Sequence, residues 1–301
     1  MKLSAIVCTY NREKYIYNAL KSIAGQDFPF SAYEIVLVDN NSTDNTESIC
    51  KKFESDYPQV DFRYFKETNQ GLSYARNRGV RESTGDVLVF VDDDATVFDN
   101  YLQSIKGFFS AYPHILACGG PIQPVYESGK PSWISHFTNQ LIGGALYEGD
   151  KVKPFRNGKY PGGGNSALRK SVFEKYGLYN TELGRKGNNL IGAEEKDFYD
   201  RMRKDGQQIY YVPQMGIYHY IPERKTSERY FNDLTYSIGK SERIRTKNVS
   251  KSAFYKRIAS EGIKWAGSVV LSIFYLLSLS PSKAKKLLQF RKNVTKGLLG
   301  F

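Results

Sequence analysis

Three adjacent carboxylates, Asp92, Asp93 and Asp94, follow the apolar run VLVFV in the first third of the chain. Neighbouring carboxylates repel one another, so holding three together is costly unless a cation lies nearby. Mg²⁺ and Mn²⁺ commonly bind through one or two carboxylates together with phosphate oxygens of a substrate. The cluster therefore indicates a divalent metal ion beside a phosphate-bearing ligand. A solvated acidic turn is the simpler alternative.

The segments that must position this cluster alternate between strands and helices. Apolar runs predict buried strands at 3–8, 33–39, 61–65 and 86–92. Helices are expected between them, at 16–25, 44–57 and 72–80. Asp44, with Glu47 three residues later, predicts a capping box at the start of the second helix. Alternation of this kind is typical of a parallel sheet with both faces covered by helices.

Polar residues follow three of these strands at the point where each strand ends. They are Thr9-Tyr10-Asn11, Asp39-Asn40 and Asp92-Asp93-Asp94. Ligands of such sheets bind in a crevice outside the carboxyl ends of the strands. We therefore expect three clusters that are far apart in sequence to line one crevice.

The second half of the chain is less regular. Residues 119–165 are rich in Gly, Pro and Tyr and predict loops with short strands. A helix is expected at 194–204, followed by two short strands that reach His219 and by a helix at 226–248. A lone histidine is by default a packing or surface residue, although imidazole is also a reasonable metal ligand beside carboxylates.

The net charge of +12 does not describe the whole chain. From Lys240 onward there are 14 Lys and Arg residues against only Glu242 and Glu261, so residues 1–239 carry 29 charges of each sign. A basic tail on a neutral body does not predict a nucleic-acid-binding protein.

Cysteine content and the N-terminus bear on the compartment. Cys8, Cys50 and Cys118 are widely spaced and form neither a disulfide framework nor a zinc pattern. The apolar run at the N-terminus ends at Thr9, too early for a signal peptide. We therefore expect the body of the protein to be cytoplasmic.

Several separated motifs, in order, resemble family 2 glycosyltransferases of the GT-A fold. They are TYNRE (9–13), VDNNSTDNT (38–46) and NQGLSYARNRGVRESTGDVLVFVDDDA (69–95). The resemblance covers about residues 1–222 and implies an α/β fold with a mostly parallel, Rossmann-like sheet. It also implies a nucleotide-sugar-binding half at 1–118 and a catalytic, acceptor-binding half at 119–222. The basic helical tail, 223–301, lies outside it.

On the donor side, the resemblance implies that the nucleotide sugar is bound by Thr9, Tyr10, Asn11, Asp39, Arg76, Asp92 and Asp93. Asp39 would accept a hydrogen bond from the base, and Arg76 would contact phosphate or ribose oxygens. Asp94 and His219 are the implied ligands of a divalent metal ion, Mn²⁺ or Mg²⁺. A polar turn at Asp39 and a surface arginine at position 76 are the alternatives.

On the acceptor side, EEKDFYDR (194–201) keeps the register of the family's Glu-Asp-x-Asp-Leu-x-x-Arg motif, with Glu195 where Asp is common. The resemblance implies that Glu195 is the base that takes the proton from the acceptor hydroxyl. Acidic residues are also favoured in the first turn of a helix by its dipole, which would explain Glu194. The residues implied to lie near the sugar and acceptor are Trp133, Gly163, Gly164, Asn165 and Glu194. For Trp133, a buried aromatic is the alternative.

The tail contains 16 residues without a charge, Trp265–Ser280, which span about 24 Å as a helix. A bilayer core of about 30 Å normally needs about 20 residues. Beyond Pro281 the apolar residues fall mostly on one helical face, with lysines elsewhere. We expect residues 250–301 to bind an anionic membrane surface peripherally. Packing of both helices on the catalytic domain or in a homodimer is the alternative.

Together these observations predict an inverting, metal-dependent glycosyltransferase. The donor would be a nucleotide-diphosphate sugar, with UDP as the expected nucleotide, and the acceptor a hydroxyl of a glycan or a lipid-linked sugar. Such an enzyme would work on the inner face of the cell membrane, in polysaccharide or lipopolysaccharide assembly. One alternative is a sugar-nucleotide nucleotidyltransferase, although TYNREKY lacks the expected glycine- and arginine-rich loop. The other is a catalytically inactive nucleotide-binding membrane scaffold.

Overall fold

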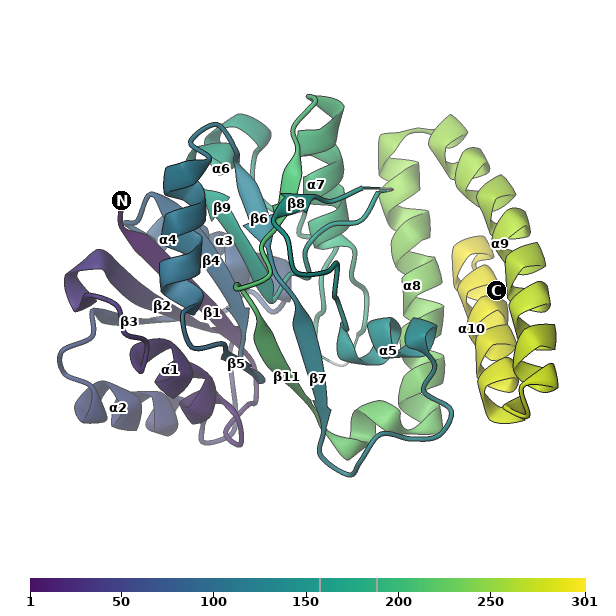
Figure 1. Cartoon of the computed structure of the whole chain (residues 1–301), viewed down its shortest axis with the longest axis horizontal. Helices are drawn as coiled ribbons and strands as arrows, with labels where there is room; N and C mark the ends of the chain where they lie inside the picture. Colours follow the sequence, from purple (N-terminus) through teal and green to yellow (C-terminus); the bar gives the residue numbers. More distant parts are fainter. Residues whose placement is uncertain (157, 188) are drawn as a thin grey trace.

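A computed structural model describes residues 1–156, 158–187 and 189–301 of the chain. Within these residues the chain forms a central eight-stranded sheet, a smaller three-stranded sheet and a group of long C-terminal helices (Figure 1). The strands of the central sheet are β1 (Leu3–Thr9), β2 (Tyr33–Asp39), β3 (Phe62–Lys66), β4 (Val87–Asp92), β6 (Ala117–Gly119), β8 (Lys153–Pro154), β9 (Asn165–Arg169) and β10 (Ile209–Tyr211). Those of the smaller sheet are β5 (Ala95–Val97), β7 (Ile122–Tyr126) and β11 (Ile217–Ile221).

The central sheet has the order β3-β2-β1-β4-β9-β6-β10-β8. Strands β3, β2, β1 and β4 are mutually parallel, which confirms the parallel sheet expected from the strand–helix alternation. The β9 strand is antiparallel to both β4 and β6. The register pairs Thr9 with Asp39, and Cys8 with Asp92, so the three polar strand ends lie at one edge of the sheet.

Helices cover both faces of this sheet, as the continuous burial of its central strands requires. One face packs against α1 (Ile16–Ala24), α2 (Thr46–Asp56) and α4 (Tyr101–Ala111). The other packs against α3 (Leu72–Glu82), α6 (Ser171–Tyr176) and α7 (Glu194–Lys204). In β4, for example, Val89 and Val91 belong to the first core and Phe90 to the second. Both faces of each strand are therefore apolar, as expected for buried parallel strands.

The predicted capping box at α2 is wrong. The helix starts one residue after Asn45, whose side chain makes no capping hydrogen bond. Asp44 instead accepts hydrogen bonds from the backbone and hydroxyl of Thr46, and Glu47 pairs with Lys51 one turn along the helix. Asp44 therefore accepts from the first backbone amide of α2, but Glu47 pairs on the helix surface, so the two side chains do not form the reciprocal hydrogen bonds of a capping box.

Asn165, the first residue of β9, ties the two sheets together. Its side-chain amide donates to the carbonyl oxygens of Pro121 and Met215, both at 2.9 Å, just before β7 and β11. Its Oδ1 accepts from the hydroxyl of Tyr101 at 2.9 Å. Asn165 is fully buried. Every hydrogen-bonding direction of this amide group is thus engaged within the fold, except one lone pair of Oδ1.

The C-terminal region consists of η2 (Glu223–Thr226), α8 (Glu228–Val249), α9 (Lys251–Leu277) and α10 (Pro281–Leu299). The α8 and α10 helices pack closely, because Gly239 and Gly297 let the two backbones approach: a Cβ on Gly239 would lie 2.1 Å from the Val294 carbonyl oxygen. Phe231 of α8 and Phe290 of α10 join a third core with the short helix α5 (His136–Gly143). Of the two tail helices considered from sequence, α10 therefore packs on the catalytic domain, as the alternative states. Within the described residues, none of the helices has the length and apolarity needed to cross a membrane.

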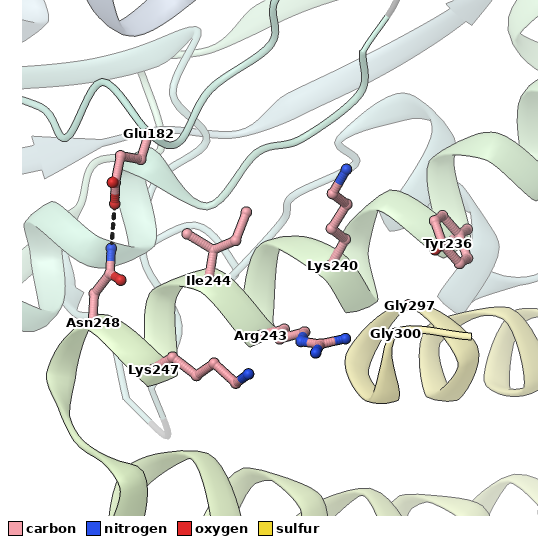
Figure 2. Close-up of a pocket in the computed structure, with 9 residues that line it drawn as sticks. All are labelled: Glu182, Tyr236, Lys240, Arg243, Ile244, Lys247, Asn248, Gly297 and Gly300. Atoms are coloured by element: carbon pink, nitrogen blue, oxygen red, sulfur yellow. Dashed lines mark hydrogen bonds between the residues drawn. The ribbon is translucent and has the colours of Figure 1, made fainter.

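A basic cavity of about 590 Å³ lies beside the C-terminal ends of α8 and α10 (Figure 2). Lys240, Arg243 and Lys247 line it from one face of α8. Glu182, from the loop before α7, reaches over it and accepts a hydrogen bond from Asn248. None of the residues at the ends of β1, β2 or β4 lines it, so it is separate from the acidic cluster.

Replacing Asn165 by Ala should lower the free energy of unfolding by about 3 kcal/mol, because it leaves the Met215 carbonyl and the buried Tyr101 hydroxyl without a partner and removes one of the two hydrogen bonds to the Pro121 carbonyl. Tyr101→Phe, which removes only one of these hydrogen bonds, should cost about 1 kcal/mol. Urea denaturation followed by circular dichroism measures both. Asn100→Ala, at an exposed residue whose side chain does not cap α4, is the control. Equal stability of the Asn165 and Asn100 variants would contradict this role.

Candidate active site

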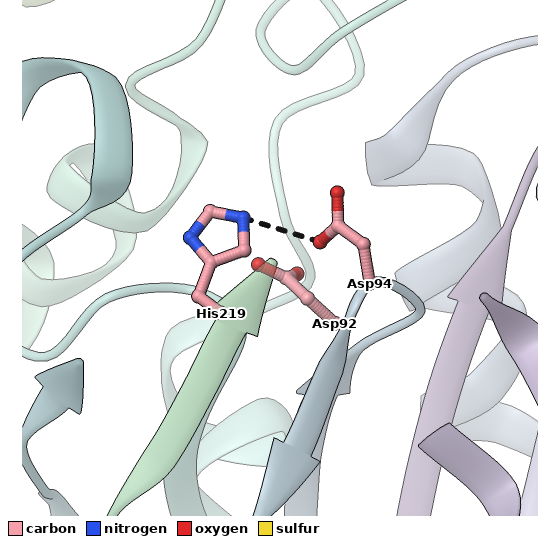
Figure 3. Close-up of side chains that lie close together, drawn as sticks. All are labelled: Asp92, Asp94 and His219. Carbon is pink, nitrogen blue, oxygen red and sulfur yellow. Dashed lines mark ion pairs between the residues drawn. The ribbon is translucent and has the colours of Figure 1, made fainter. Parts of the chain in front are cut away.

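Asp92, Asp94 and His219 form an acidic cluster where β4 ends beside β11 (Figure 3). One ligand atom from each residue lies within 4.8 Å of the other two. Asp94 Oδ1 lies 3.2 Å from His219 Nε2. The backbone also joins these strands, since the Tyr220 N–H donates to the Asp94 carbonyl at 2.9 Å. The histidine expected from sequence to complete the metal site therefore does lie beside the carboxylates.

The orientation of His219 is set by a hydrogen bond on its far side. Its Nδ1 lies 2.8 Å from the carbonyl oxygen of Gly143, at the end of α5. A carbonyl oxygen can only accept, so Nδ1 carries the hydrogen, and in neutral imidazole the lone pair is then on Nε2. That lone pair points toward a carboxylate oxygen, which is also a hydrogen-bond acceptor. Two acceptors that face each other need a proton or a cation between them.

Two positively charged side chains lie beside the acidic cluster, and neither was assigned a role from the sequence. Lys225 of η2 is buried, and its Nζ lies 2.9 Å from Asp94 Oδ2 and 3.4 Å from His219 Nε2. Arg12 contacts Asp93 Oδ1 through Nε at 3.0 Å and Asp94 Oδ2 through Nη2 at 3.4 Å. Arg12 is part of TYNRE, directly after the first strand, and could have been found there. Lys225 is one of many lysines near the basic tail and carries no comparable signal.

These contacts give neighbouring carboxyl groups different pKa values. Burial acts to raise the pKa of Asp94, but Lys225, His219 and Arg12 outweigh it and hold the pKa well below its usual value. Burial raises the pKa of Asp93 to about 6, although Arg12 opposes this. Asp94, between Lys225 and Arg12, therefore keeps its negative charge to a lower pH than Asp93 does.

The glycine-rich segment before β9 brings the backbone against both groups of acidic residues. A Cβ on Gly164 would lie 1.9 Å from the carboxyl carbon of Asp92. A Cβ on Gly163 would lie 1.8 Å from Glu195 Oε1 and 2.5 Å from Arg76 Nη2. A larger residue at either position would displace the carboxylate beside it. Between Asp92 and Glu195 thus lies the backbone of two adjacent glycines, Gly163 and Gly164, which carry no side chains.

Glu194 and Glu195, the first two residues of α7, share one arginine. Arg76 Nη1, from α3, lies 2.8 Å from Glu194 Oε1 and 3.0 Å from Glu195 Oε1. Glu194 is buried, and its Oε2 has no hydrogen-bond partner among the described residues. Glu195 keeps about a fifth of its side chain exposed, 21%. The structure thus brings Arg76, Glu194 and Glu195, all of them predicted site residues, into one group.

The two glutamates have opposite pKa shifts. Burial and the charge of Glu195 raise the pKa of Glu194 to about 7. Burial also acts to raise the pKa of Glu195, but Arg76 and the backbone amide outweigh it, so this pKa lies below its usual value of 4.5. At neutral pH the more exposed carboxyl is therefore an anion that can accept a proton, whereas its buried neighbour is partly protonated.

The predicted base-binding residues lie at the ends of β1 and β2. Thr9 is buried and Tyr10 partly buried, and Asn11 adopts a positive φ of 53° while its Oδ1 accepts from the Thr43 N–H. Asp39 is fully buried, and its two oxygens accept from the Ser42 N–H at 2.8 Å and the Tyr64 hydroxyl at 2.7 Å. These bonds stabilise the turn after β2, and a carboxylate oxygen can accept a further hydrogen bond.

Two predicted sugar-binding residues have other contacts in the structure. Trp133 packs edge-on against Phe231, with ring centres 5.5 Å apart, and the Lys286 ammonium lies over its indole at 4.9 Å. It belongs to the core between α5 and the C-terminal helices, as the alternative of a buried aromatic states. Asn165 holds the two sheets together, as described above. The binding of sugar by either side chain remains a prediction.

The donor set at the acidic cluster fits a divalent cation. Two carboxylates suit Mg²⁺ and Mn²⁺, and a neutral imidazole with its lone pair directed inward adds a nitrogen ligand. The Gly143 carbonyl supplies the hydrogen bond that usually orients such a histidine. The Lys225 ammonium lies between Asp94 and His219, where a bound cation would also have to interact with both.

Curated relatives share sequence with most of this chain. A glucosyl-dolichyl phosphate glucuronosyltransferase from Haloferax volcanii is 28% identical over 250 residues, which is 81% of this chain and 77% of the relative. A GalNAc(5)-diNAcBac-PP-undecaprenol beta-1,3-glucosyltransferase from Campylobacter jejuni is 27% identical over 66% of this chain and 62% of its own length. Other curated relatives are matched over much less of their length, for example 21% of GlyA from Streptococcus pneumoniae.

Solved structures share the fold. A mannosyltransferase from Pyrobaculum calidifontis, in complex with GDP-Man and Mn²⁺, superposes with a TM-score of 0.65 at 19% identity, over 99% of this chain and 87% of that one. TarS 1–349 from Staphylococcus aureus, in complex with UDP-GlcNAc, has a TM-score of 0.57 at 20% identity, over 100% of this chain and 92% of that one. At these identities the likeness shows the GT-A fold.

The family model for glycosyl transferase family 2 matches residues 4–177, more than half of the chain. This stretch contains the strand ends, the acidic cluster except His219, the arginine of α3 and the glycine-rich segment. The chain belongs to glycosyl transferase family 2.

Proposed function

We propose that this enzyme transfers a sugar from a nucleotide-diphosphate donor to an acceptor hydroxyl with inversion at the anomeric carbon. One observation carries the proposal: Gly163 and Gly164 hold Glu195 and Asp92 at the two ends of one bare stretch of backbone. A donor diphosphate at Asp92 and Asp94 would therefore present its sugar toward Glu195. One ionised carboxylate facing the sugar is what a single displacement requires.

In this displacement the acceptor oxygen bonds to the anomeric carbon while the bond from that carbon to the diphosphate oxygen breaks. The electron pair leaves with the diphosphate, and the acceptor proton passes to Glu195. Arg76 keeps Glu195 ionised and fixes its direction. Glu194 is buried behind the same arginine, and its Oε2 has no hydrogen-bond partner among the described residues.

On the donor side, Asp92, Asp94 and His219 would hold a divalent cation, Mn²⁺ or Mg²⁺, which would supply positive charge to the leaving diphosphate. Arg12 and Lys225 add two positive charges that belong to the chain itself. Thr9, Tyr10, Asn11 and Asp39 line the edge where the base would bind. The cation, Arg12 and Lys225 would stabilise negative charge on the diphosphate before and during bond breakage.

The relatives support a donor and acceptor of this kind. The solved structures hold GDP-Man or UDP-GlcNAc, and the curated names include sugar transfer to dolichyl- or undecaprenol-linked molecules. We propose a UDP-sugar donor and a glycan or lipid-linked acceptor, at the inner face of the cell membrane, in cell-surface polysaccharide or lipopolysaccharide assembly. A panel of UDP- and GDP-sugars, followed by nucleotide release, tests base and sugar together.

Glu195→Gln should lower kcat for nucleotide release by about 10²–10⁴-fold, because it removes the proton acceptor but keeps the shape of the side chain. Donor affinity, measured by calorimetry, should stay within about threefold. Asp197→Asn, in the same helical turn but paired with Arg201, is the control and should retain activity. Unchanged turnover in Glu195→Gln would contradict the assignment of the base.

Lys225→Met should increase the affinity for Mn²⁺, measured calorimetrically without donor, by at least about tenfold. The reason is that a buried ammonium within 4 Å of both Asp94 and His219 repels a second cation. Lys286→Met, which removes another buried lysine that pairs with Glu228 outside the site, is the control. Equal affinities in wild type and Lys225→Met would show that the lysine does not compete with the metal. Absence of Mn²⁺ binding in every variant would contradict the metal site itself.

Arg76→Met should move the acidic limb of the kcat/KM profile to higher pH. In the wild type Arg76 lowers the pKa of Glu195, so the base loses its charge only below about pH 4.5. Removing an opposite charge at hydrogen-bond distance raises a carboxyl pKa by about 1–3 units. Arg78→Met, on the same helix but paired with Glu82, is the control. An acidic limb at the same pH in Arg76→Met and wild type would rule out this pairing as the cause.

A further inference from the structure

The helix α9 has its polar side inward and its apolar side outward. Toward the protein it presents Glu261, Ser268 and Ser272, all buried. Glu261 pairs with Arg291 of α10 at 2.9 Å, and the same arginine donates to the Ser268 hydroxyl at 3.2 Å. Helices on the surface of a protein in water have the opposite arrangement.

The outward side of α9 is a continuous apolar surface. Ile263, Val270, Phe274 and Leu277 are spaced by seven, four and three residues, which places them within one narrow face of a helix. Ile263 is 77% exposed, Phe274 61% and Leu277 78%. Large exposed apolar patches on a folded protein mark interaction surfaces. We call these four residues, together with Ile273 and with Leu279 just after the helix ends, the outer face of α9.

No other described part of the chain uses this surface. The apolar side of α10, which includes Leu287, Phe290 and Val294, is buried. Phe290 and Val294 join the core formed with α8 and α5. Of the two C-terminal helices expected to bind a membrane, α10 is therefore occupied by the protein itself, and α9 is the one that faces outward. Figure 1 shows α9 at the edge of the molecule, farthest from the central sheet.

The charges around the outer face are almost all positive. Glu261 is the only Asp or Glu side chain in residues 250–301, and Arg257 and Arg291 neutralise it. Lys256 precedes Ile263 by seven residues on the same side of α9, and it is exposed. At the opposite end Lys283 and Lys285 follow the last apolar residue, Leu279. Apolar residues flanked at both ends by lysines match a surface of anionic lipid.

We propose that the outer face of α9 is a docking surface for an anionic lipid bilayer, in which the helix lies along the interface with its apolar side chains among the acyl chains. This inference rests on the proposed place of the enzyme at a membrane, and it identifies the surface involved. The α10 helix packs on the inner side of α9, and the α5 helix links α10 to the active site. Its Phe137 packs on Phe290 of α10 at 4.8 Å, and its Gly143 carbonyl orients His219.

The test is sedimentation of the full-length protein with vesicles made of phosphatidylcholine alone or mixed with phosphatidylglycerol. The wild type should pellet with the anionic vesicles, and high salt should weaken this binding. The double variant Phe274→Ser/Leu277→Ser should partition at least about tenfold less, because burial of either side chain contributes more than a factor of ten. Lys283→Gln/Lys285→Gln should lose the preference for phosphatidylglycerol.

Tyr147→Ser, at a residue 66% exposed in the loop before β8, removes an equally exposed aromatic elsewhere and should pellet like the wild type. Melting followed by circular dichroism confirms that each variant is folded. Equal pelleting of wild type and Phe274→Ser/Leu277→Ser would overturn the proposal. So would a wild-type dimer that becomes monomeric in this variant without binding lipid, since the outer face would then join two copies.

Donor binding, measured by calorimetry without vesicles, separates this proposal from the proposed enzyme activity. The variants of α9 should bind the donor as the wild type does, because none of their residues lies in the active site. Pelleting as expected without donor binding would leave the docking surface standing and contradict the catalytic proposal. Donor binding without any pelleting of the wild type would contradict the docking surface and leave the catalytic proposal standing.

Discussion

Repulsion among the carboxylates at the end of β4 is the constraint on which the rest of this site depends. Asp92, Asp93 and Asp94 cannot remain together as anions at a buried sheet edge without positive charge around them. The chain supplies Arg12 from the end of β1 and Lys225 from η2, two segments more than 200 residues apart. The carboxylates themselves would attract a divalent cation, and the positive charge around them would stabilise a departing diphosphate.

In the second acidic group, repulsion between the carboxylates is reduced in a different way. Glu194 and Glu195 share Arg76, and the site gives one carboxyl a pKa of about 7 and the other a pKa below its usual value. Differences in burial and in contact with the arginine separate their roles. The two glycines between the groups then serve a geometric purpose: they let the backbone, not a side chain, fill the space beside both carboxylates.

The C-terminal helices are part of the same architecture. Lys225 enters the acidic cluster from the turn that begins them, and α8 and α10 pack on α5, which in turn orients His219. An α9 helix with its apolar side outward thus lies at the end of a continuous series of contacts from the active site. Attachment at that surface would hold the enzyme at a membrane, where the proposed lipid-linked acceptor would lie.

The sequence by itself determined the parallel sheet, its strand ends and the position of Asp92–Asp94, because apolar runs of strand length and polar strand ends are local patterns. It also pointed to Glu195 and His219, through motif register. Only the tertiary structure decided that Lys225 neutralises Asp94, that Asn165 ties two sheets together, and that α10 faces inward while α9 faces outward. Each of these depends on contacts between distant segments, for which a lysine, an asparagine or an apolar helix carries no local signal.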